Sequence, residues 1–482
     1  MDRSRLPLIE ELPAWLSPFQ AFERFYRERH AIFLDSGMDP YRLGRFSFIG
    51  VDPFLVMKSR GRDVRIITGQ GEQKLDGNPF DILGGLLEKY SLDSFASRVP
   101  FAGGAAGYLA YDLCHFIERL PTSAVDDLHL PESYLGFYDV LLAFDNLEKR
   151  CYVISTGFPE LDRVRRLKRA HVRLEEMEHK LSCTYAIRRS EDGRMEMGEG
   201  RELIIKSNFT PEGYVEAVQR VREYIAAGDV FQVNLSQRFE AELNVPPFEL
   251  YCRLREINPA PFASYLNFEE VTVVSASPER FLKVSGDWVE TRPIKGTRPR
   301  GKTPEDDERL AKELLGSIKD RAENVMIVDL ERNDLGKVCR YGTVKVTELA
   351  ILETFPTVFH LTSTVVGRLR PDKTRIDLLK ASFPGGSITG APKVRAMEII
   401  DELEPTRRSV YTGCIGYFSF DGNMDLNIVI RTILIKGGRA YFQVGGGIVY
   451  DSEPEAEYQE TLDKAKALVQ ALRLAPRVAV ES

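Results

Sequence analysis

The chain has 482 residues, of which 43% are hydrophobic and 28% charged, proportions that are ordinary for a folded globular protein. Lysine and arginine total 65 against 72 acidic residues, a formal net charge of −7, and no basic run typical of nucleic-acid binding stands out. The N-terminal sequence does not resemble a signal peptide, and no apolar stretch approaches roughly 18 residues, so we expect a cytoplasmic protein without a membrane span. The six cysteines are scattered, which argues against a structural zinc site or a disulfide framework.

The first part of the chain predicts a mixture of strands and helices. The patterns indicate strands at 46–49 and 138–144 and a helix near 160–182. The following residues are polar and include the run Arg188-Arg189-Ser190-Glu191-Asp192-Gly193, which indicates a linker. We therefore predict three parts, at 1–182 (an N-terminal region), 183–208 (a linker) and 209–472 (the catalytic domain).

The helix and strand patterns are clearer after the linker. Thr210-Pro211-Glu212 has the composition of a helix start. Residues 230–239 then alternate between a largely apolar face and a polar face that carries Gln232, Asn234, Ser236 and Arg238. A strand with so polar a face is usually solvated, but it can also line a polar cavity. Helices and strands alternate without a β-α-β order, so we predict an α+β protein in which antiparallel sheets form a sandwich with helices packed outside.

Two predicted helices carry acidic pairs whose spacing places both carboxylates on one face. Asp320 and Glu323 are three residues apart on one helix. Glu457 and Glu460 repeat the spacing on the last helix, where Lys464 continues the same stripe. Carboxylates from two helices can share a magnesium ion, which prefers oxygen ligands. For either pair alone, a solvated charged face is the more common interpretation.

Two glycine-rich segments could bring backbone N–H groups close to an anion. Gly445-Gly446-Gly447 follows a predicted strand, and Ser387 lies in Phe383-Pro-Gly-Gly-Ser-Ile-Thr-Gly-Ala-Pro-Lys393. Neither segment has the order of a nucleotide-binding P-loop, and a tight turn is the simpler interpretation of three consecutive glycines.

Two single residues have both a structural and a chemical interpretation. His360 lies in an apolar strand, where a core histidine is more common than a catalytic one. Lys295 lies in the basic segment 292–302, which could be a flexible surface loop. A desolvated lysine near other cations would instead have a lowered pKa and act as a nucleophile. These patterns alone indicate an enzyme for a small anionic substrate, with magnesium.

Taken together and in order, several segments resemble one family, the chorismate-utilising enzymes. The segments are GDVFQVNLSQRF (228–239), SASPERF (275–281), TRPIKGTRPRG (291–301), KDRAENVMIVDLERNDLG (319–336), FPGGSITGAPK (383–393), YTGCIGYFS (411–419), IRT (430–432) and the run from GGGIV to DKAKA (445–467). They resemble the chorismate-binding domain shared by component I of anthranilate and aminodeoxychorismate synthases and by isochorismate and salicylate synthases. The resemblance implies an anthranilate synthase component I-like fold.

The resemblance also implies roles for residues of this chain. It implies magnesium bound at Glu323 and Glu460, with Asp320 and Glu457 as companion acids. It implies substrate binding by seven residues, namely Ser387, Tyr411, Arg431, Gly445, Gly446, Gly447 and Lys464. His360 matches a residue near the reacting ring, and Glu279 matches the general acid/base that assists departure of the ring hydroxyl.

Two positions distinguish the branches of the family. Isochorismate and salicylate synthases have a water-activating lysine where Gln232 stands, so the resemblance favours ammonia as the nucleophile. Anthranilate synthases typically have alanine where Lys295 stands, whereas aminodeoxychorismate synthases have lysine. We therefore expect amination of chorismate at C4 to 4-amino-4-deoxychorismate through a covalent lysine intermediate, in 4-aminobenzoate and folate biosynthesis. The alternatives are an anthranilate synthase component I, in tryptophan biosynthesis, and a catalytically silent subunit that keeps the fold.

The resemblance also bears on partners and regulation. The chain has no glutaminase nucleophile turn, so a separate glutamine amidotransferase subunit is expected to supply ammonia. Phe33-Leu34-Asp35-Ser36 resembles a segment that binds tryptophan in related proteins, which more usually reads L-L-E-S. Asp35 departs from that sequence, which argues against feedback inhibition and leaves a buried structural tryptophan as the alternative.

Overall fold

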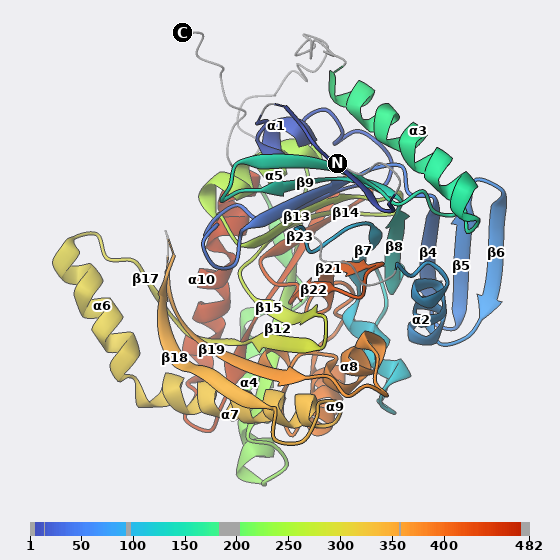
Figure 1. Cartoon of the computed structure of the whole chain (residues 1–482). Helices are drawn as coiled ribbons and strands as arrows, with labels where there is room; N and C mark the ends of the chain where they lie inside the picture. The colour runs from blue at the N-terminus through green and yellow to red at the C-terminus, as the bar shows by residue number, and fades with distance from the viewer. Residues whose placement is uncertain (1–4, 14, 93–97, 183–202, 356–357, 474–482) are drawn as a thin grey trace.

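The computed structural model describes residues 5–13, 15–92, 98–182, 203–355 and 358–473. Two large antiparallel sheets pack face to face, and helices cover their outer sides (Figure 1). The predicted α+β class and the sandwich with outer helices are therefore confirmed. Within these ranges no helix is both long and apolar enough to cross a membrane.

The first sheet combines strands from both ends of the chain. Its hydrogen-bonded order is β1 (Leu8–Glu11), β10 (Arg150–Ser155), β9 (Val140–Asp145), β3 (Phe46–Gly50), β2 (Ala31–Asp35), β13 (Phe262–Asn267), β14 (Thr272–Ser277), β23 (Thr432–Lys436), β24 (Arg439–Ile448), β12 (Gln232–Glu242) and β11 (Ile205–Ser207), with β20 (Gly390–Ala391) also pairing with β12. The early strand β2 pairs directly with β13, in antiparallel register from Ala31↔Asn267 to Asp35↔Ala263.

The second sheet has the same mixed origin. Its order is β17 (Ile294–Pro299), β19 (Val358–Arg368), β16 (Trp288–Arg292), β15 (Arg280–Ser285), β22 (Met424–Asn427), β21 (Cys414–Ser419), β7 (Gly104–Leu109), β8 (Ser133–Tyr138), β4 (Leu55–Arg60), β5 (Asp63–Thr68) and β6 (Gly71–Asp76), with β18 (Lys345–Thr354) also pairing with β19. Here β7 pairs with β21. Both predicted regions thus contribute strands to each sheet, and residues 183–202 of the predicted linker lie outside the described residues.

Helices pack on the outer faces of both sheets. The helices of the described residues are α1 (Pro18–Phe22), α2 (Pro79–Lys89), α3 (Arg163–Ser182), α4 (Pro211–Ala226), α5 (Pro247–Ile257), α6 (Pro304–Gly316), α7 (Ile318–Gly336), α8 (Arg375–Ser382), α9 (Lys393–Leu403), α10 (Pro454–Arg473) and the short 3-10 helices η1 (Tyr111–Phe116) and η3 (Gly386–Ile388). Leu174 of α3 and Leu468 of α10 pack against the first sheet, and Leu335 of α7 packs against the second. Each such side chain contributes roughly 1.5–3 kcal/mol to folding when fully buried.

The prediction of a single strand at 138–144 is wrong. The chain leaves the second sheet at Tyr138 and enters the first sheet at Val140, so this run holds the end of β8 and most of β9. Asp139, at the crossing, is buried, and its carboxylate pairs with Arg169 and Arg173 of α3 at 3.2 Å each. Both strands are buried on both faces, so the run stays apolar across the crossing and its periodicity gives no sign of the break.

Candidate active site

A cavity of about 700 Å³ lies among β12 and β24 of the first sheet, β17 and β19 of the second, and helices α7 and α10. Its lining includes every residue that the sequence pointed to for catalysis, substrate binding or metal binding. They are Lys295, Glu279, His360, Ser387, Tyr411, Arg431, Gly445, Gly446, Gly447, Lys464, Asp320, Glu323, Glu457 and Glu460. The structure therefore brings together residues that are scattered along the chain from Glu279 to Lys464.

Lys295 reaches the cavity because strand β17 is irregular at that point. The pairing of β17 with β19 shifts register between Ile294 and Thr297, and Gly296 has a φ of +87°, which favours glycine. The Nζ atom of Lys295 lies 3.4 Å from the position that a Cβ on Gly447 would take. Burial lowers the pKa of Lys295, although the carboxylate of Glu323 opposes that shift. The lysine thus belongs to a strand and lines the cavity, and its lowered pKa increases the fraction of neutral, nucleophilic amine.

Glu279 is a buried carboxyl group between β14 and β15. It is 4% exposed, and its Oε1 accepts a hydrogen bond of 2.6 Å from the Ser387 hydroxyl and one of 3.3 Å from the Ile294 N–H. Burial raises the pKa of Glu279 to about 7, against the opposing effect of both hydrogen bonds and of Lys295. A carboxyl group in this state can hold a proton near neutral pH and give it to a leaving group.

His360 is held as a neutral imidazole. Its Nδ1 lies 2.8 Å from the Thr297 hydroxyl, and its ring meets Phe355 edge to face with centroids 5.2 Å apart. Burial, followed by the nearby charge of Arg431, lowers the pKa of His360 to about 3. The imidazole can therefore donate or accept a hydrogen bond in the cavity without carrying a charge near neutral pH.

The acidic side of the cavity is formed by α7 and α10. Lys464 pairs with Glu460 of its own helix at 2.7 Å and lowers the pKa of that carboxyl group. Burial instead raises the pKa of Glu323 and of Glu457, and Glu457 accepts a hydrogen bond of 2.6 Å from the Ser452 hydroxyl. Asp320 pairs with Arg298 at 3.1 Å.

These acids fit a magnesium ion only if water and substrate supply most of its ligands. Across the described ranges, no three Asp, Glu, His or Cys side chains form a group tight enough to hold a metal ion alone. Magnesium does not require such a group, because it usually keeps several waters and binds one or two carboxylates together with the substrate. Glu323 and Glu460 line the same cavity from two helices and offer that number of carboxylates.

The three glycines lie inside a strand, so the prediction that they follow one is wrong. Strand β24 continues to Ile448, and Gly445 and Gly447 pair with Ser236 and Asn234 of β12. A Cβ on Gly446 would lie 3.1 Å from Glu457 Oε2, and one on Gly447 would lie 2.3 Å from Gln232 Nε2. Because glycine has no Cβ, the side chains of Glu457 and Gln232 can lie directly against the backbone of this strand.

Arg431 and Tyr411 present donors for an anionic group. Arg431 has a φ of +53°, which is rare for a residue other than glycine and is often found at functional sites. Its Nη1 donates to the carbonyl of Lys464 at 2.8 Å. Burial raises the pKa of Tyr411, so its hydroxyl remains a donor. A guanidinium and a phenol that line the same cavity are suited to bind a carboxylate.

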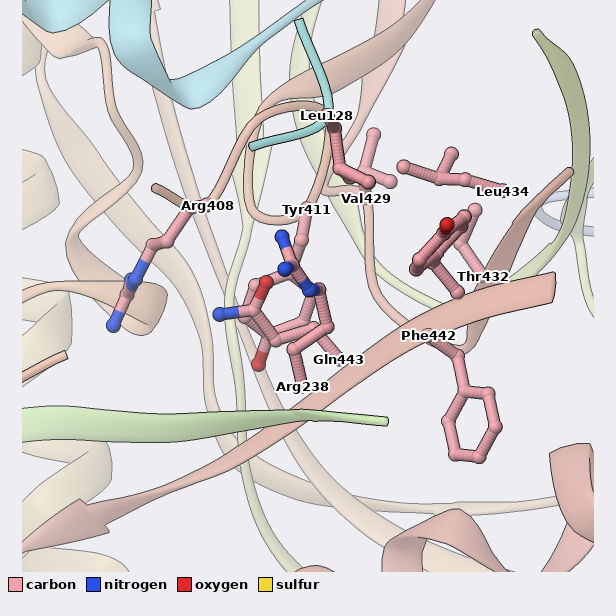
Figure 2. A pocket seen from close by; sticks show the side chains of 10 residues that line it. Leu128, Arg238, Arg408, Tyr411, Val429, Thr432, Leu434, Phe442 and Gln443 are labelled. Atoms are coloured by element: carbon pink, nitrogen blue, oxygen red, sulfur yellow. The ribbon is translucent and has the colours of Figure 1, made fainter. Parts of the chain in front are cut away.

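Gln443 lines the cavity and was missed by the sequence reasoning. With Tyr411 it also borders a small adjoining cavity of about 10 Å³, room for roughly one water molecule (Figure 2). Its Nε2 donates to Ser236 Oγ at 2.8 Å. Ser236 belongs to the polar face of β12, which is buried, and Asn234 on that face lines the main cavity. Of the two interpretations of this strand, the polar cavity is confirmed, and its alternation was the signal that could have pointed to Gln443.

A second, separate cavity of about 410 Å³ includes Leu34, Asp35 and Ser36, the segment that resembles a tryptophan-binding one. Asp35 is buried and accepts hydrogen bonds from Tyr251 at 2.8 Å and Arg255 at 2.5 Å. One oxygen of its carboxylate is therefore engaged by the protein itself.

Comparison with known proteins gives a consistent assignment. The chain matches the family of chorismate binding enzymes over residues 50–470. It is 40% identical to anthranilate synthase component 1 of Acetivibrio thermocellus, over 99% of this chain and 97% of that protein. It is also 40% identical to aminodeoxychorismate synthase component 1 of Bacillus subtilis strain 168, over 98% of each. The crystal structure of anthranilate synthase component I from Streptococcus pneumoniae TIGR4 matches with a TM-score of 0.76 and 35% identity, over 94% of this chain and 97% of that one, which confirms the expected fold.

Proposed function

This chain belongs to the family of chorismate-binding enzymes, and we propose that within the family it aminates chorismate at C4 to give 4-amino-4-deoxychorismate. Overall identity does not distinguish the two component 1 types, since it is 40% to one of each. The observation that carries the proposal is the position of Lys295, which lines the cavity close to Gly447, with its pKa lowered by burial. A lysine there can serve as a nucleophile that an alanine could not replace.

In the proposed reaction, nitrogen enters in two displacements. The neutral amine of Lys295 bonds to C2 of the ring, both ring double bonds shift by one position, and the C4–O bond breaks as Glu279 gives its proton to the departing hydroxyl, releasing water. Ammonia then bonds to C4, both double bonds shift back, and the C2–N bond breaks to restore the lysine amine. The new C4 ammonium returns one proton to Glu279. The balance is one ammonia consumed and one water released, with both protein groups regenerated.

The remaining residues of the cavity have proposed binding roles. Arg431 and Tyr411, with the backbone of Gly445, Gly446 and Gly447, would hold the pyruvyl carboxylate. Glu323 and Glu460 would hold a magnesium ion, which neutralises the ring carboxylate when bound. Asp320 and Glu457 would stand near that ion, and Lys464 would face the same ring carboxylate. His360 and Ser387 would lie at the reacting ring.

We further propose that ammonia comes from a glutamine amidotransferase subunit. The name component 1, carried by the similar proteins, supports an assembly of two components. The product would then enter 4-aminobenzoate and folate biosynthesis. Free ammonia should replace the partner at high concentration.

The test is one incubation with chorismate, magnesium and ammonium at mildly alkaline pH, with the products identified by mass. A 4-amino product that retains the pyruvyl group supports the proposal. Anthranilate together with pyruvate would refute it and establish the second candidate, an anthranilate synthase, which the similarity to proteins of that name favours.

Substitution of the lysine gives a second test. We expect Lys295→Ala to slow formation of the 4-amino product by more than about a thousandfold, as removal of a covalent nucleophile commonly does. Anthranilate could then accumulate, because ammonia would attack C2 directly. The matched control is Lys302→Ala, since Lys302 is an exposed lysine of the same basic segment outside the cavity lining. Unchanged amination by Lys295→Ala would exclude the lysine from the mechanism.

A further inference from the structure

Glu331 of α7 is a buried carboxyl group that the proposed reaction does not use. It is 2% exposed, and both of its oxygens are engaged. Its Oε1 accepts a hydrogen bond of 3.1 Å from the N–H of Gly386, and its Oε2 accepts one of 3.5 Å from the hydroxyl of Thr291. Burying a carboxylate is costly unless such contacts compensate it, so Glu331 requires both neighbours in place.

The two neighbours of Glu331 belong to the two segments that hold Glu279. Gly386 directly precedes Ser387, whose hydroxyl donates to Glu279 Oε1 at 2.6 Å. Thr291 lies three residues before Ile294, whose N–H donates to the same oxygen at 3.3 Å. Glu331 therefore accepts hydrogen bonds from the same two segments that donate hydrogen bonds to Glu279.

The turn at Gly386 rests directly on α7. A Cβ added to Gly386 would lie 2.6 Å from Leu330 Cδ2 and 3.1 Å from Glu331 Oε1. There is no space for the turn to settle closer, and losing the carboxylate would leave the Gly386 N–H buried without this acceptor. An unpaired buried N–H is costly, so the turn should shift when Glu331 is removed.

Other charges also face Glu331. Asp334, on the same helix, pairs with Lys393 of α9 at 2.5 Å and with Lys337 at 2.9 Å. Burial raises the pKa of Glu331, Asp334 raises it further, and Lys393 opposes both. The negative charge of Glu279 also raises the pKa of Glu331.

We propose that Glu331 is a positioning residue for amination, which holds the Gly386–Ser387 turn and the Thr291–Ile294 segment so that both stay hydrogen-bonded to Glu279. The inference rests on the proposed function in one respect, the use of Glu279 as the acid/base. It does not depend on which carbon receives the nitrogen.

Two substitutions separate the position of the turn from the charge of the residue. Glu331→Gln keeps an oxygen that can accept from Gly386, so it should retain most of kcat. Glu331→Ala removes that acceptor, and kcat should fall by about 100-fold or more, because a displaced acid/base loses its contribution. KM for chorismate should stay unchanged in Glu331→Gln and rise in Glu331→Ala, because the displaced turn carries Ser387, which would lie at the reacting ring. Asp329→Ala is the matched control, because Asp329 is an exposed acid of the same helix that pairs with Arg332.

The pH dependence provides a readout that a purely structural role would not move. The hydrogen bonds from Ser387 and Ile294 lower the pKa of Glu279, so Glu331→Ala, which releases both donors, should move the alkaline fall of kcat/KM to higher pH. Glu331→Gln should leave that fall in place. The concentration of neutral ammonia must be held constant at each pH. If Glu331→Ala does not fold, as judged by its melting curve, Thr291→Val is measured in its place, because it removes the second contact of Glu331. An unmoved alkaline limb overturns the proposal.

A double substitution tests whether Glu331 acts through Ser387. In a Ser387→Ala background, Glu331→Ala should cost little more than either change alone, because residues that act on one group are not additive. Additive losses would overturn the proposal, as would an Ala variant with full kcat or a Gln variant that loses as much as Ala. Failure of the proposed function is a different result, since the unchanged protein would then not form the 4-amino product.

Discussion

Glu279 and Glu460 line one cavity but differ in nearly everything that surrounds them. Glu279 is 4% exposed and contacts a hydroxyl and an amide, and burial raises its pKa to about 7. The side chain of Glu460 is 49% exposed and pairs with Lys464, which lowers its pKa. The same residue type is thus ready to carry a proton in one place and held ionised in the other. Environment separates the proposed acid from the proposed metal ligand, as in other enzymes with paired carboxylates.

The largest expected effect comes from neutralising the buried member of this pair. Glu279→Gln should lower kcat by about 10² to 10⁴-fold, the usual contribution of a general acid/base. In the unchanged protein, kcat/KM should fall as pH rises above about 7, because Glu279 must be protonated to release the hydroxyl. That limb should disappear in the variant. Glu305→Gln, at an exposed site on α6, is the control. Normal activity in the Glu279→Gln variant would show that Glu279 is not the general acid.

The same substitution should stabilise the fold at alkaline pH. The pKa of Glu279 is raised from 4.5 to about 7 on folding, so the native state loses stability as pH rises across that interval. At pH 8 the variant should gain about 3 kcal/mol in the free energy of unfolding, measured by denaturant titration. Lost activity with gained stability would separate a chemical role from a folding defect.

A smaller effect is expected from substitution of Glu460, the more exposed of the two glutamates. Glu460→Gln should raise the magnesium concentration for half-maximal activity by at least about tenfold, because one of few charged ligands is lost. Magnesium should also raise the melting temperature of the chorismate-bound protein less than in the unchanged protein. Glu455→Gln, an exposed acid of the same helix, should change neither value. An unaltered magnesium requirement would show that Glu460 is no ligand.

The smallest effect concerns His360. Burial and Arg431 lower its pKa to about 3, so it should stay neutral from pH 5 to 9. His360→Gln should therefore lower kcat without moving either limb of the pH profile. A displaced limb, measured at constant neutral ammonia, would mean that His360 titrates and that the cavity is wetter around it than its burial indicates.

The sequence predicted the class and the cavity better than it predicted the paths of strands. The proline-marked helix start at Thr210 leads into α4, because capping is a local property. The change of sheet at Asp139 was missed, since the two arginines that compensate its buried carboxylate lie on a helix 30 and 34 residues later. The triple glycine was placed outside its strand because the steric reason for glycine lies in Gln232 and Glu457, which the sequence does not place beside it.

The members of the site were predicted together only because several segments resembled one family. Spacing alone identified Asp320, Glu323, Glu457 and Glu460 as candidates, but a solvated face was the more common explanation of each pair. Gln443 and Glu331 were not identified, because a polar residue acquires such a role only from burial and partners that folding supplies.

Strand β24 lies between β23 and β12, yet about 200 residues separate β12 from β24 along the chain. At ribosomal rates of roughly 5–20 residues per second, β12 would wait about 10–40 s for that neighbour. Throughout this interval one edge of β12 is unpaired and its polar face has no cavity to line. A nascent chain with an open edge can pair with other chains, so the order of synthesis leaves β12 open to intermolecular pairing until β24 arrives.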